Sequence, residues 1–288
     1  MSAAPVAETI TSWYAQAARD LPWRDSGCPP WGVLVSEVML QQTPVGRVQP
    51  VWAEWLARWP TPAALASSPA GDAVRAWGRL GYPRRALRLH AAAAAIVDRH
   101  GGEVPAAYDD LRALPGVGDY TASAVAAFAF GERVAVLDTN VRRVYARVFD
   151  GAADAPPSVT VAERRAALER VPVQGPGRYA VAVMELGALV CTARAPRCSS
   201  CPVAGECRWR ALGAPPAVAP RRVQRYEGTD RQARGRLLGI VRDASAPVAA
   251  ARLARGWADE AQRERAIAGL VADGLVVAAG DGTYRLPA

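Results

Sequence analysis

Apolar residues recur at three- and four-residue steps along most of the chain up to residue 190, the spacing that one face of an α-helix requires. Proline and glycine separate these periodic segments and mark where helices end. The run at 133–137 is too short and isolated to indicate a sheet, so the sequence predicts a mostly α-helical protein. The predicted helices are 8–19, 31–42, 48–58, 72–79, 84–99, 106–113, 119–130, 141–149, 161–170 and 178–190.

The pattern changes after residue 210. Residues 213–223 are rich in proline and arginine and have no hydrophobic period, which is typical of a linker. Residues 224–288 then resemble a winged helix, in which three helices are followed by two strands around a Gly-Asp-Gly turn. Winged helices read DNA, contact proteins or only pack, and the pattern favours none of these. The elements predicted here are 231–242, 249–255, 261–272, 275–278 and 283–286.

The composition narrows the class of protein. At 288 residues and 51% hydrophobic content, the chain can form two or three compact units. Its net charge of +8 suits a polyanionic partner, although charge alone does not establish nucleic-acid binding. The sequence shows neither a secretion signal nor an apolar run of the roughly 20 residues that cross a bilayer. We therefore expect a cytoplasmic protein, nucleoid-associated in a bacterium, and a monomer by default.

The basic residues have one chemical peculiarity, because all 35 residues counted as Lys and Arg are arginines. Arginine binds phosphate through two parallel hydrogen bonds and stays charged at any working pH. No lysine amine is present in this sequence to form a Schiff base with a sugar aldehyde or another carbonyl substrate.

Four of the five cysteines form the short cluster Cys191, Cys198, Cys201 and Cys207. Four thiolates from one segment suit either a tetrahedral zinc ion or a four-iron cluster. Zinc sites usually combine two short Cys-x2–4-Cys pairs, whereas the cluster here has one tight pair and two longer spacings. The spacing favours a [4Fe-4S] cluster, with structural zinc and paired disulfides as alternatives. Cys28 stands alone and supports no inference.

Residues 106–131 contain two predicted helices joined by the turn LPGVG at 114–118. This arrangement is typical of a helix-hairpin-helix, in which Gly116 and Gly118 let backbone N–H groups bind a DNA phosphate without reading sequence. An ordinary turn between two helices is the alternative. Asp119 would repel the phosphate unless it caps the second helix.

Two acidic residues are candidates for acid–base chemistry. Glu37 shares a predicted helical face with Val33, Leu34 and Leu40, and burial there would raise its pKa and keep it protonated near neutral pH. A surface glutamate or a structural ion pair with an arginine is the alternative. Asp138 lies just before a predicted helix, and taken alone it is best explained as a helix N-cap.

Five motifs together resemble the adenine DNA glycosylases of the MutY type, within the endonuclease III superfamily, over about residues 8–210. The motifs are SEVMLQQT at 36–43, RLGY at 79–82, LPGVGDYTA at 114–122, LDTNVRRV at 137–144, and MELGALVC with the three further cysteines at 184–207. The resemblance implies the helix-hairpin-helix glycosylase fold. In that fold, 23–134 would form a six-helix barrel module, 1–22 and 135–212 would form an iron-sulfur cluster module, and the active-site cleft would lie between them.

The resemblance also implies a reaction, the hydrolytic removal of adenine mispaired with 8-oxoguanine or guanine after the nucleotide has been flipped out of the duplex. Glu37 would protonate the adenine and Asp138 would stabilise the sugar cation, while Tyr120 and Asn140 shape the site around that cation. Tyr120 occupies the position of the Schiff-base lysine of bifunctional relatives. Together with the lack of lysine, this predicts base removal without strand cleavage.

Further residues are implied in contacts with DNA, the adenine and the cluster. Gln42 and Tyr82 match the wedges that fill the gap left by the flipped base, and Thr43 and Leu80 match contacts around the opposite guanine. Arg24, Leu40 and Glu185 match the adenine pocket, Gly116 and Gly118 the phosphate-binding hairpin, and Arg194 and Arg197 a cluster loop that reaches phosphates. The four cysteines would ligate a cluster with a structural and DNA-positioning role.

The sequence departs from the family at its C-terminal end. Residues 224–288 are too short for the Nudix-like domain that usually ends these enzymes and lack its Glu-rich box, so strong discrimination of 8-oxoguanine from guanine is not implied. Two other functions stay open. A thymine glycosylase for T·G mismatches would share the hairpin, Asp138 and the cluster without needing Glu37 as an acid. A non-enzymatic iron-sulfur, winged-helix regulator would leave Glu37 and Asp138 unused.

Overall fold

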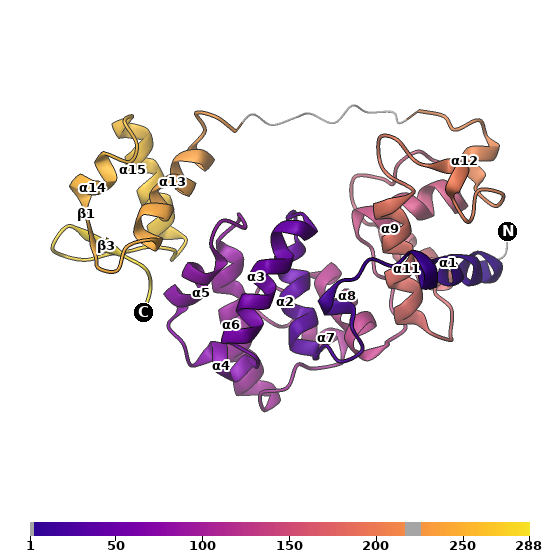
Figure 1. Ribbon diagram of the computed structural model, residues 1–288, viewed down its shortest axis with the longest axis horizontal. Helices are drawn as coiled ribbons and strands as arrows, with labels where there is room; N and C mark the ends of the chain where they lie inside the picture. The colour runs from indigo at the N-terminus through magenta and orange to yellow at the C-terminus, as the bar shows by residue number, and fades with distance from the viewer. Residues whose placement is uncertain (1–2, 217–225) are drawn as a thin grey trace. The chain divides into compact units, whose positions relative to one another are not determined.

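The computed structural model describes residues 3–216 and 226–288, and most of its elements are α-helices (Figure 1). The chain divides into two compact units. Unit 1 comprises residues 1–37, 105–113 and 117–221, and unit 2 comprises residues 38–104, 114–116 and 222–288. In the part of the chain that is described, no helix is long and apolar enough to cross a membrane.

Unit 1 is built around helix α11, against which α1, α8 and α9 pack. Glycines allow these helices to approach closely. A Cβ atom added at Gly187 would lie 2.8 Å from the carbonyl oxygen of Asn140, and one at Gly177 would lie 2.2 Å from that of Ala127. The elements are α1 (Ala3–Ala17), η1 (Pro22–Arg24), the first part of α2 (Pro30–Leu40), α7 (Tyr108–Arg112), α8 (Asp119–Phe130), α9 (Thr139–Tyr145), the π-turn η2 (Ala146–Asp150), α10 (Val161–Arg170), α11 (Pro176–Leu189), η3 (Cys198–Ser200) and α12 (Arg208–Ala211).

Unit 2 packs α4 and α5 against α6. Its interior is rich in tryptophan, and the ring of Trp55 meets the edges of Trp59 and Trp77 at centroid distances of 4.7 Å and 5.7 Å. The helices are the end of α2, α3 (Val45–Arg58), α4 (Pro62–Ala66), α5 (Ala70–Trp77), α6 (Arg84–His100), α13 (Asp230–Arg242), α14 (Ala250–Ala254) and α15 (Glu260–Ala272). The strands are β1 (Val248–Ala249), β2 (Val277–Ala278) and β3 (Thr283–Arg285).

The three short strands form an antiparallel sheet in the order β1-β3-β2. Val248 pairs with Tyr284, and Val277 pairs with Arg285, so the last strand lies between the other two. The strands β2 and β3 follow α15, β1 lies between α13 and α14 in the sequence, and α13 and α15 pack against each other. This arrangement agrees with the winged-helix-like order expected from the sequence.

The structure confirms the mostly helical fold class and differs from the sequence expectations in details. The helix expected over 141–149 ends as α9 at Tyr145 and continues as a π-turn, and the segments α4 and β1 were not expected. Both are short, and two to five residues carry little periodic signal. The linker predicted at 213–223 lies partly outside the described residues. The expected module boundaries at 22/23 and 134/135 stay a prediction.

Candidate active site and cluster pocket

Glu37 lies on α2 with a side chain that is only 4% exposed. Its Oε2 atom accepts a hydrogen bond of 2.7 Å from the hydroxyl of Tyr120. Burial raises the pKa of Glu37 to about 7, against the opposing effects of the Tyr120 hydrogen bond and the charge of Arg24. The surface alternative is therefore wrong for Glu37, and burial favours its protonated form.

Asp138 caps helix α9, as the sequence pattern indicated. Its Oδ1 accepts from the backbone N–H of Val141 at 2.6 Å, and its Oδ2 accepts from the amide of Asn140 at 2.8 Å. Burial raises the pKa of Asp138, while these two donors oppose the rise by binding the ionised form. The charge of Asp138 also raises the pKa of Glu37, so the two carboxyl groups lie near enough to interact.

Tyr120 links the two carboxyl groups electrostatically. It is the second residue of α8, and burial raises its pKa well above the usual value, with further contributions from Glu37 and Asp138. The phenol therefore stays protonated and acts as a hydrogen-bond donor to Glu37. The structure brings Glu37, Tyr120, Asp138 and Asn140 together within unit 1.

Glu185 is fully buried and binds two arginines. Arg19 donates to it from its backbone N–H and twice from its guanidinium, at 2.7 Å to 3.1 Å, and Arg24 donates at 2.8 Å. Burial disfavours the charge, but the hydrogen bonds of Arg19 and the charge of Arg24 outweigh it and lower the pKa of Glu185 to about 2. Glu185 thus holds Arg24 within electrostatic reach of Glu37.

Arg143 connects the start of α9 to the first cysteine of the cluster segment. Its guanidinium donates to Asn140 Oδ1 at 2.8 Å, to the Gly187 carbonyl at 2.7 Å and to the Cys191 carbonyl at 2.7 Å. Because Asn140 in turn donates to Asp138, a continuous set of hydrogen bonds runs from Cys191 to the carboxylate. Because Gly187 has no side chain, its backbone lies close to Asn140, and this allows the hydrogen-bonded groups to lie near one another.

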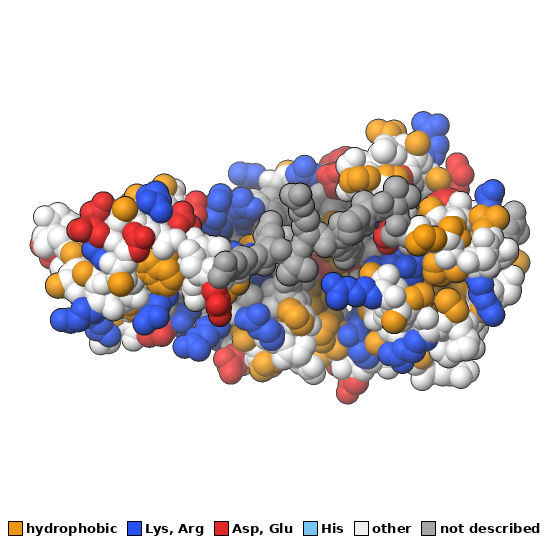
Figure 2. Space-filling model, turned by 90° about the horizontal axis from the view of Figure 1, so that it is seen from above, with side chains coloured by type: hydrophobic (Ala, Val, Ile, Leu, Met, Phe, Trp, Pro, Cys, Tyr) orange, Lys and Arg blue, Asp and Glu red, His pale blue; other side chains and the backbone are white. Residues whose placement is uncertain are grey.

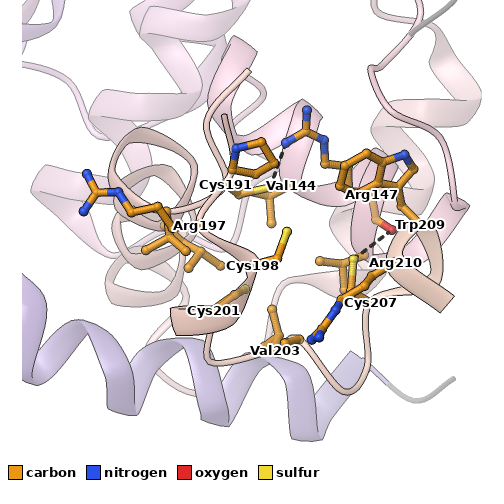
Figure 3. A pocket seen from close by; sticks show the side chains of 15 residues that line it. Val144, Arg147, Cys191, Arg197, Cys198, Cys201, Val203, Cys207, Trp209 and Arg210 are labelled. Atoms are coloured by element: carbon orange, nitrogen blue, oxygen red, sulfur yellow. Dashed lines mark hydrogen bonds between the residues drawn. The ribbon is translucent and has the colours of Figure 1, made fainter. Parts of the chain in front are cut away.

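The four clustered cysteines line one pocket of about 370 Å³, and Figure 3 shows their sulfur atoms around a common space. All four are free thiols. No three ligand side chains among residues 3–216 and 226–288 are close enough together to hold a single metal ion. The remaining lining is mostly apolar, and Arg147 donates to the sulfur of Cys191 at 3.5 Å. A pocket walled by four thiols, with a mostly apolar remaining lining, fits a polynuclear iron-sulfur cluster.

The cluster segment also presents arginines. Arg194 and Arg197 are exposed, as expected for residues that reach phosphates, and Arg197 also lines the pocket. Arg147 is buried, where it donates to the carbonyl of Thr192 at 2.8 Å and lies 4.6 Å from the ring centroid of Trp209. Contact of Arg194 and Arg197 with DNA stays a prediction, whereas Arg147 holds the segment in place.

The predicted hairpin turn is present between α7 and α8. Gly116 adopts a φ of 78°, which L side chains rarely reach, and Gly118 is the N-cap residue of α8. Asp119 does not cap the helix. It pairs instead with Arg112 at 2.6 Å and Arg164 at 3.0 Å, and the Arg112 hydrogen bond lowers its pKa. Its charge is thereby neutralised next to the proposed phosphate site.

In unit 2, the two expected wedge residues share an unusual backbone conformation. Gln42 has a φ of 55° and Tyr82 a φ of 48°, and the Tyr82 side chain is 48% exposed. Positive φ is uncommon for residues other than glycine and needs support from the surrounding structure. That support comes from Arg85.

Arg85 is only 7% exposed and donates five hydrogen bonds that hold both turns. The acceptors are the carbonyls of Val38, Met39, Gln41 and Gly81 and the hydroxyl of Thr43, at 2.5 Å to 3.0 Å. Thr43 also donates to the Leu80 carbonyl at 3.2 Å. Thr43 and Leu80 are buried and Leu40 is half-buried, so contact of these three with DNA or adenine stays a prediction.

Sequence reasoning missed the buried arginines Arg85, Arg143, Arg147 and Arg242, and the half-buried Arg19 that binds Glu185. Arginine is usually a surface residue, and Arg85, for example, lies between the exposed Arg84 and Arg88. No local signal separates them, because their burial depends on partners far away in the sequence.

Two family descriptions match the chain. Residues 35–170 match the HhH-GPD superfamily of base excision DNA repair proteins, and residues 191–207 match the iron-sulfur binding domain of endonuclease III. The second match covers the four cysteines that line the pocket and agrees with a [4Fe-4S] cluster.

Similar whole proteins are also known. The chain is 52% identical over 287 residues to an adenine DNA glycosylase of Mycolicibacterium smegmatis, covering 99% of this chain and 97% of that protein. It is 51% identical to an adenine DNA glycosylase of Mycobacterium tuberculosis, covering 96% and 92%. Among solved structures, a thermostable thymine-DNA glycosylase matches with a TM-score of 0.68 at 26% identity, covering 73% of this chain and 97% of that one.

Proposed function

This chain belongs to the adenine DNA glycosylases, and from that premise we propose that it removes adenine mispaired with 8-oxoguanine or guanine, by hydrolysis and without cutting the strand. The family membership rests on relatives more than 50% identical over nearly the whole chain. The chain is therefore a DNA-binding base-excision-repair enzyme with an iron-sulfur cluster. The mispair it prefers and the roles of individual residues are the parts proposed here.

The observation that carries the proposal is the buried Glu37 with its pKa of about 7. An adenine anion is a poor leaving group, so hydrolysis needs a proton on the base before the glycosidic bond breaks. A carboxyl group whose pKa is raised to about 7 is available in its protonated form at neutral pH and supplies that proton. Tyr120 holds Oε2 of Glu37 at 2.7 Å, which fixes the carboxyl group in one orientation.

Asp138 is proposed to act in the ionised form. As the base departs, positive charge develops on the sugar, and a carboxylate held by Val141 and Asn140 stabilises that charge, directly or through a transient covalent bond. Water then completes the hydrolysis. Two carboxyl groups in different environments thus take opposite protonation states, one as an acid and the other as an anion.

The absence of strand cleavage is proposed from the nucleophiles in the chain. A glycosylase that also cuts the strand forms a Schiff base between an amine and the sugar, and this sequence contains no lysine. Tyr120 stands where bifunctional relatives carry that lysine, and its hydroxyl is engaged with Glu37. A protonated phenol that donates to a carboxyl group is not a substitute for an amine.

Contacts with the duplex are proposed for the exposed residues of both units. The wedge role of Gln42 and Tyr82 is supported by their unusual backbone, which holds each side chain on a turn supported by Arg85. Gly116, Gly118 and the exposed Arg194 and Arg197 are proposed to bind phosphates. The cluster, when bound, orders the segment that carries these two arginines.

The thymine-glycosylase alternative shares the fold, because a thymine-DNA glycosylase is among the similar structures. Thymine removal does not require a protonated carboxyl group at the position of Glu37, so the observed burial favours adenine. A non-enzymatic regulator would give no reason for the buried pair of Glu37 and Asp138.

A panel of labelled duplexes tests the proposal under enzyme excess. The duplexes contain A·8-oxoG, A·G, T·G and A·T pairs, and each product is analysed with and without alkali. We expect excision from A·8-oxoG and A·G, with strand breaks only after alkali treatment. Excision from T·G alone would replace adenine by thymine as the substrate, and breaks before alkali would contradict hydrolysis without strand cleavage.

A further inference from the structure

An open groove in unit 2 is lined by seven arginines and two exposed tyrosines. It encloses about 1730 Å³, open solvent included, and its walls come from 41–88 on one side and 226–275 on the other. Arginine side chains, blue in Figure 2, gather on the surface where residues 226–288 meet the rest of unit 2. The C-terminal segment thus contributes directly to a basic surface.

Most of the positive charge in this groove has no acidic partner. Arg84 and Arg234 both pair with Asp273, and Arg85 is bound to carbonyls of its own turn region. Within the described residues, no carboxylate pairs with the other four lining arginines, which are Arg47, Arg79, Arg88 and Arg231. Four unpaired guanidinium groups around one groove favour an anionic occupant with several charges.

Two exposed aromatic residues of the groove indicate which kind of anion it could bind. Tyr82 is 48% exposed and Tyr226 is 49% exposed, although large apolar rings are usually covered in a monomer. The guanidinium of Arg231 lies 5.1 Å from the ring centroid of Tyr226. Flat exposed rings beside unpaired arginines are the combination that binds a nucleic-acid strand, because bases or sugars stack on the rings while phosphates pair with the arginines.

The alternative use of a winged helix, insertion of a recognition helix into the major groove, is less well supported. The arginines of α15 have acidic partners, since Arg263 is 3.8 Å from Glu260 of the same helix, and Arg265 is 3.6 Å from Asp230 of α13. Among the four groove arginines without an acidic partner, the one from the C-terminal segment is Arg231, which lies on α13 and lines the groove. This distribution favours backbone contact over reading of base edges.

We infer that residues 226–288 form one wall of a groove that binds the DNA backbone next to the turn of Tyr82, with Arg231 on a phosphate and Tyr226 stacked on a neighbouring base or sugar. The inference rests on the proposed function, because the groove contains the proposed wedges Gln42 and Tyr82. According to this inference, residues 226–288 increase the affinity for the DNA duplex, and this increase does not depend on which base stands opposite the adenine.

Two variants test the inference in the full-length protein with its cluster. Arg231→Gln removes one proposed phosphate contact, and Tyr226→Ala removes the stacking ring. Arg252→Gln is the matched control, because Arg252 is an exposed arginine of the same segment that does not line the groove. All three are combined with Glu37→Gln, which keeps the adenine on the strand, and binding to an A·8-oxoG duplex is measured by fluorescence anisotropy over a range of salt concentrations.

Arg231→Gln should weaken binding roughly tenfold at low salt and reduce the slope of log affinity against log salt by about 0.9, the value for one lost phosphate contact. Tyr226→Ala should weaken binding about tenfold at every salt concentration, without changing that slope. Duplexes in which a methylphosphonate replaces one phosphate at a time should identify the phosphate that Arg231 contacts. Neutralising that phosphate should weaken binding of the protein with Arg231 but should not further weaken binding of Arg231→Gln.

The outcomes separate this inference from the proposed function. If wild-type protein excises adenine while Arg231→Gln and Tyr226→Ala bind DNA like Arg252→Gln, the groove does not bind DNA and the inference is overturned. If the wild type excises no adenine, the proposed function fails, whatever the salt slopes show. An equal loss of affinity in Arg252→Gln and in Arg231→Gln would mean that only the total charge of the protein matters, and this would also overturn the inference.

Discussion

Tyr120→Phe should move the pH dependence of adenine excision to higher pH. The Tyr120 hydroxyl donates to Glu37 at 2.7 Å, and this hydrogen bond lowers the pKa of Glu37 against the larger effect of burial. Phenylalanine keeps the ring and removes the donor, so the ionised form of Glu37 loses a partner. The pKa of Glu37 must then rise above its present value of about 7.

The size of the shift follows from hydrogen-bond energies. A hydrogen bond to a charged group contributes about 1.5–3 kcal/mol, and one to a neutral carboxyl group about 1 kcal/mol. The difference of roughly 0.5–2 kcal/mol corresponds to about one pKa unit. Because the acid acts in its protonated form, the rate falls as pH rises through the pKa. At pH 8 the protonated fraction should therefore increase from about one tenth to about one half.

Single-turnover excision from an A·8-oxoG duplex, measured between pH 5 and 9 under enzyme excess, gives the midpoint of this alkaline fall. We expect about 7 for the wild type and about 8 for Tyr120→Phe, whatever the change in the maximal rate. Tyr108→Phe is the control, because it also removes a hydrogen bond to a carboxylate, Asp119, but one outside the active site. An unchanged midpoint, or one shifted to lower pH, would refute the assignment of Glu37 as the acid tuned by Tyr120.

Three further predictions concern the acid, the turn and the cluster. Glu37→Gln should bind the A·8-oxoG duplex like the wild type yet lose about two to four powers of ten in single-turnover rate, and near-normal turnover would reject its role. Arg85→Lys keeps the charge, but a lysine cannot reach all five acceptors of Arg85. The loss of two hydrogen bonds should lower the free energy of unfolding by about 3 kcal/mol, measured by urea denaturation of the holoprotein. An unchanged urea midpoint would show that Arg85 does not stabilise the two turns. Purified protein should be brown and contain about four iron atoms, and Cys198→Ser should lose both the iron and the broad visible absorption; a colourless, zinc-containing and active wild type would refute the cluster.

The local sequence pattern determined most of the secondary structure. The helices α6, α8 and α10 begin and end within one residue of the positions that periodicity and the flanking Pro, Gly and Thr residues predict. Such signals are local, because a helical face repeats within a few residues and a cap acts within one turn. The same locality explains why the four cysteines, all within one short segment, indicated a cluster before any fold was known.

The site was predictable only in part. The motifs around Glu37, Tyr120 and Asp138 pointed to these residues through family resemblance, but no local pattern determines whether Glu37 is buried or paired. The state of Glu37 depends on the hydroxyl of Tyr120, which is 83 positions away in the sequence, and on the charge of Asp138. It also depends on Arg24, which is held by Glu185 at a distance of 161 positions. The pKa of about 7 is the sum of these long-range effects and of burial.

The sequence by itself indicated most of the helical segments, favoured a metal cluster at the four cysteines and showed that no lysine can attack the sugar, because these depend on residue type and spacing. The tertiary structure alone decided which arginines are interior. Arg85 resembles its exposed neighbours Arg84 and Arg88 in sequence, yet it is buried where distant backbone carbonyls converge, as Arg143 also is. A buried guanidinium is stable only where several acceptors surround it, and the fold brings those acceptors together.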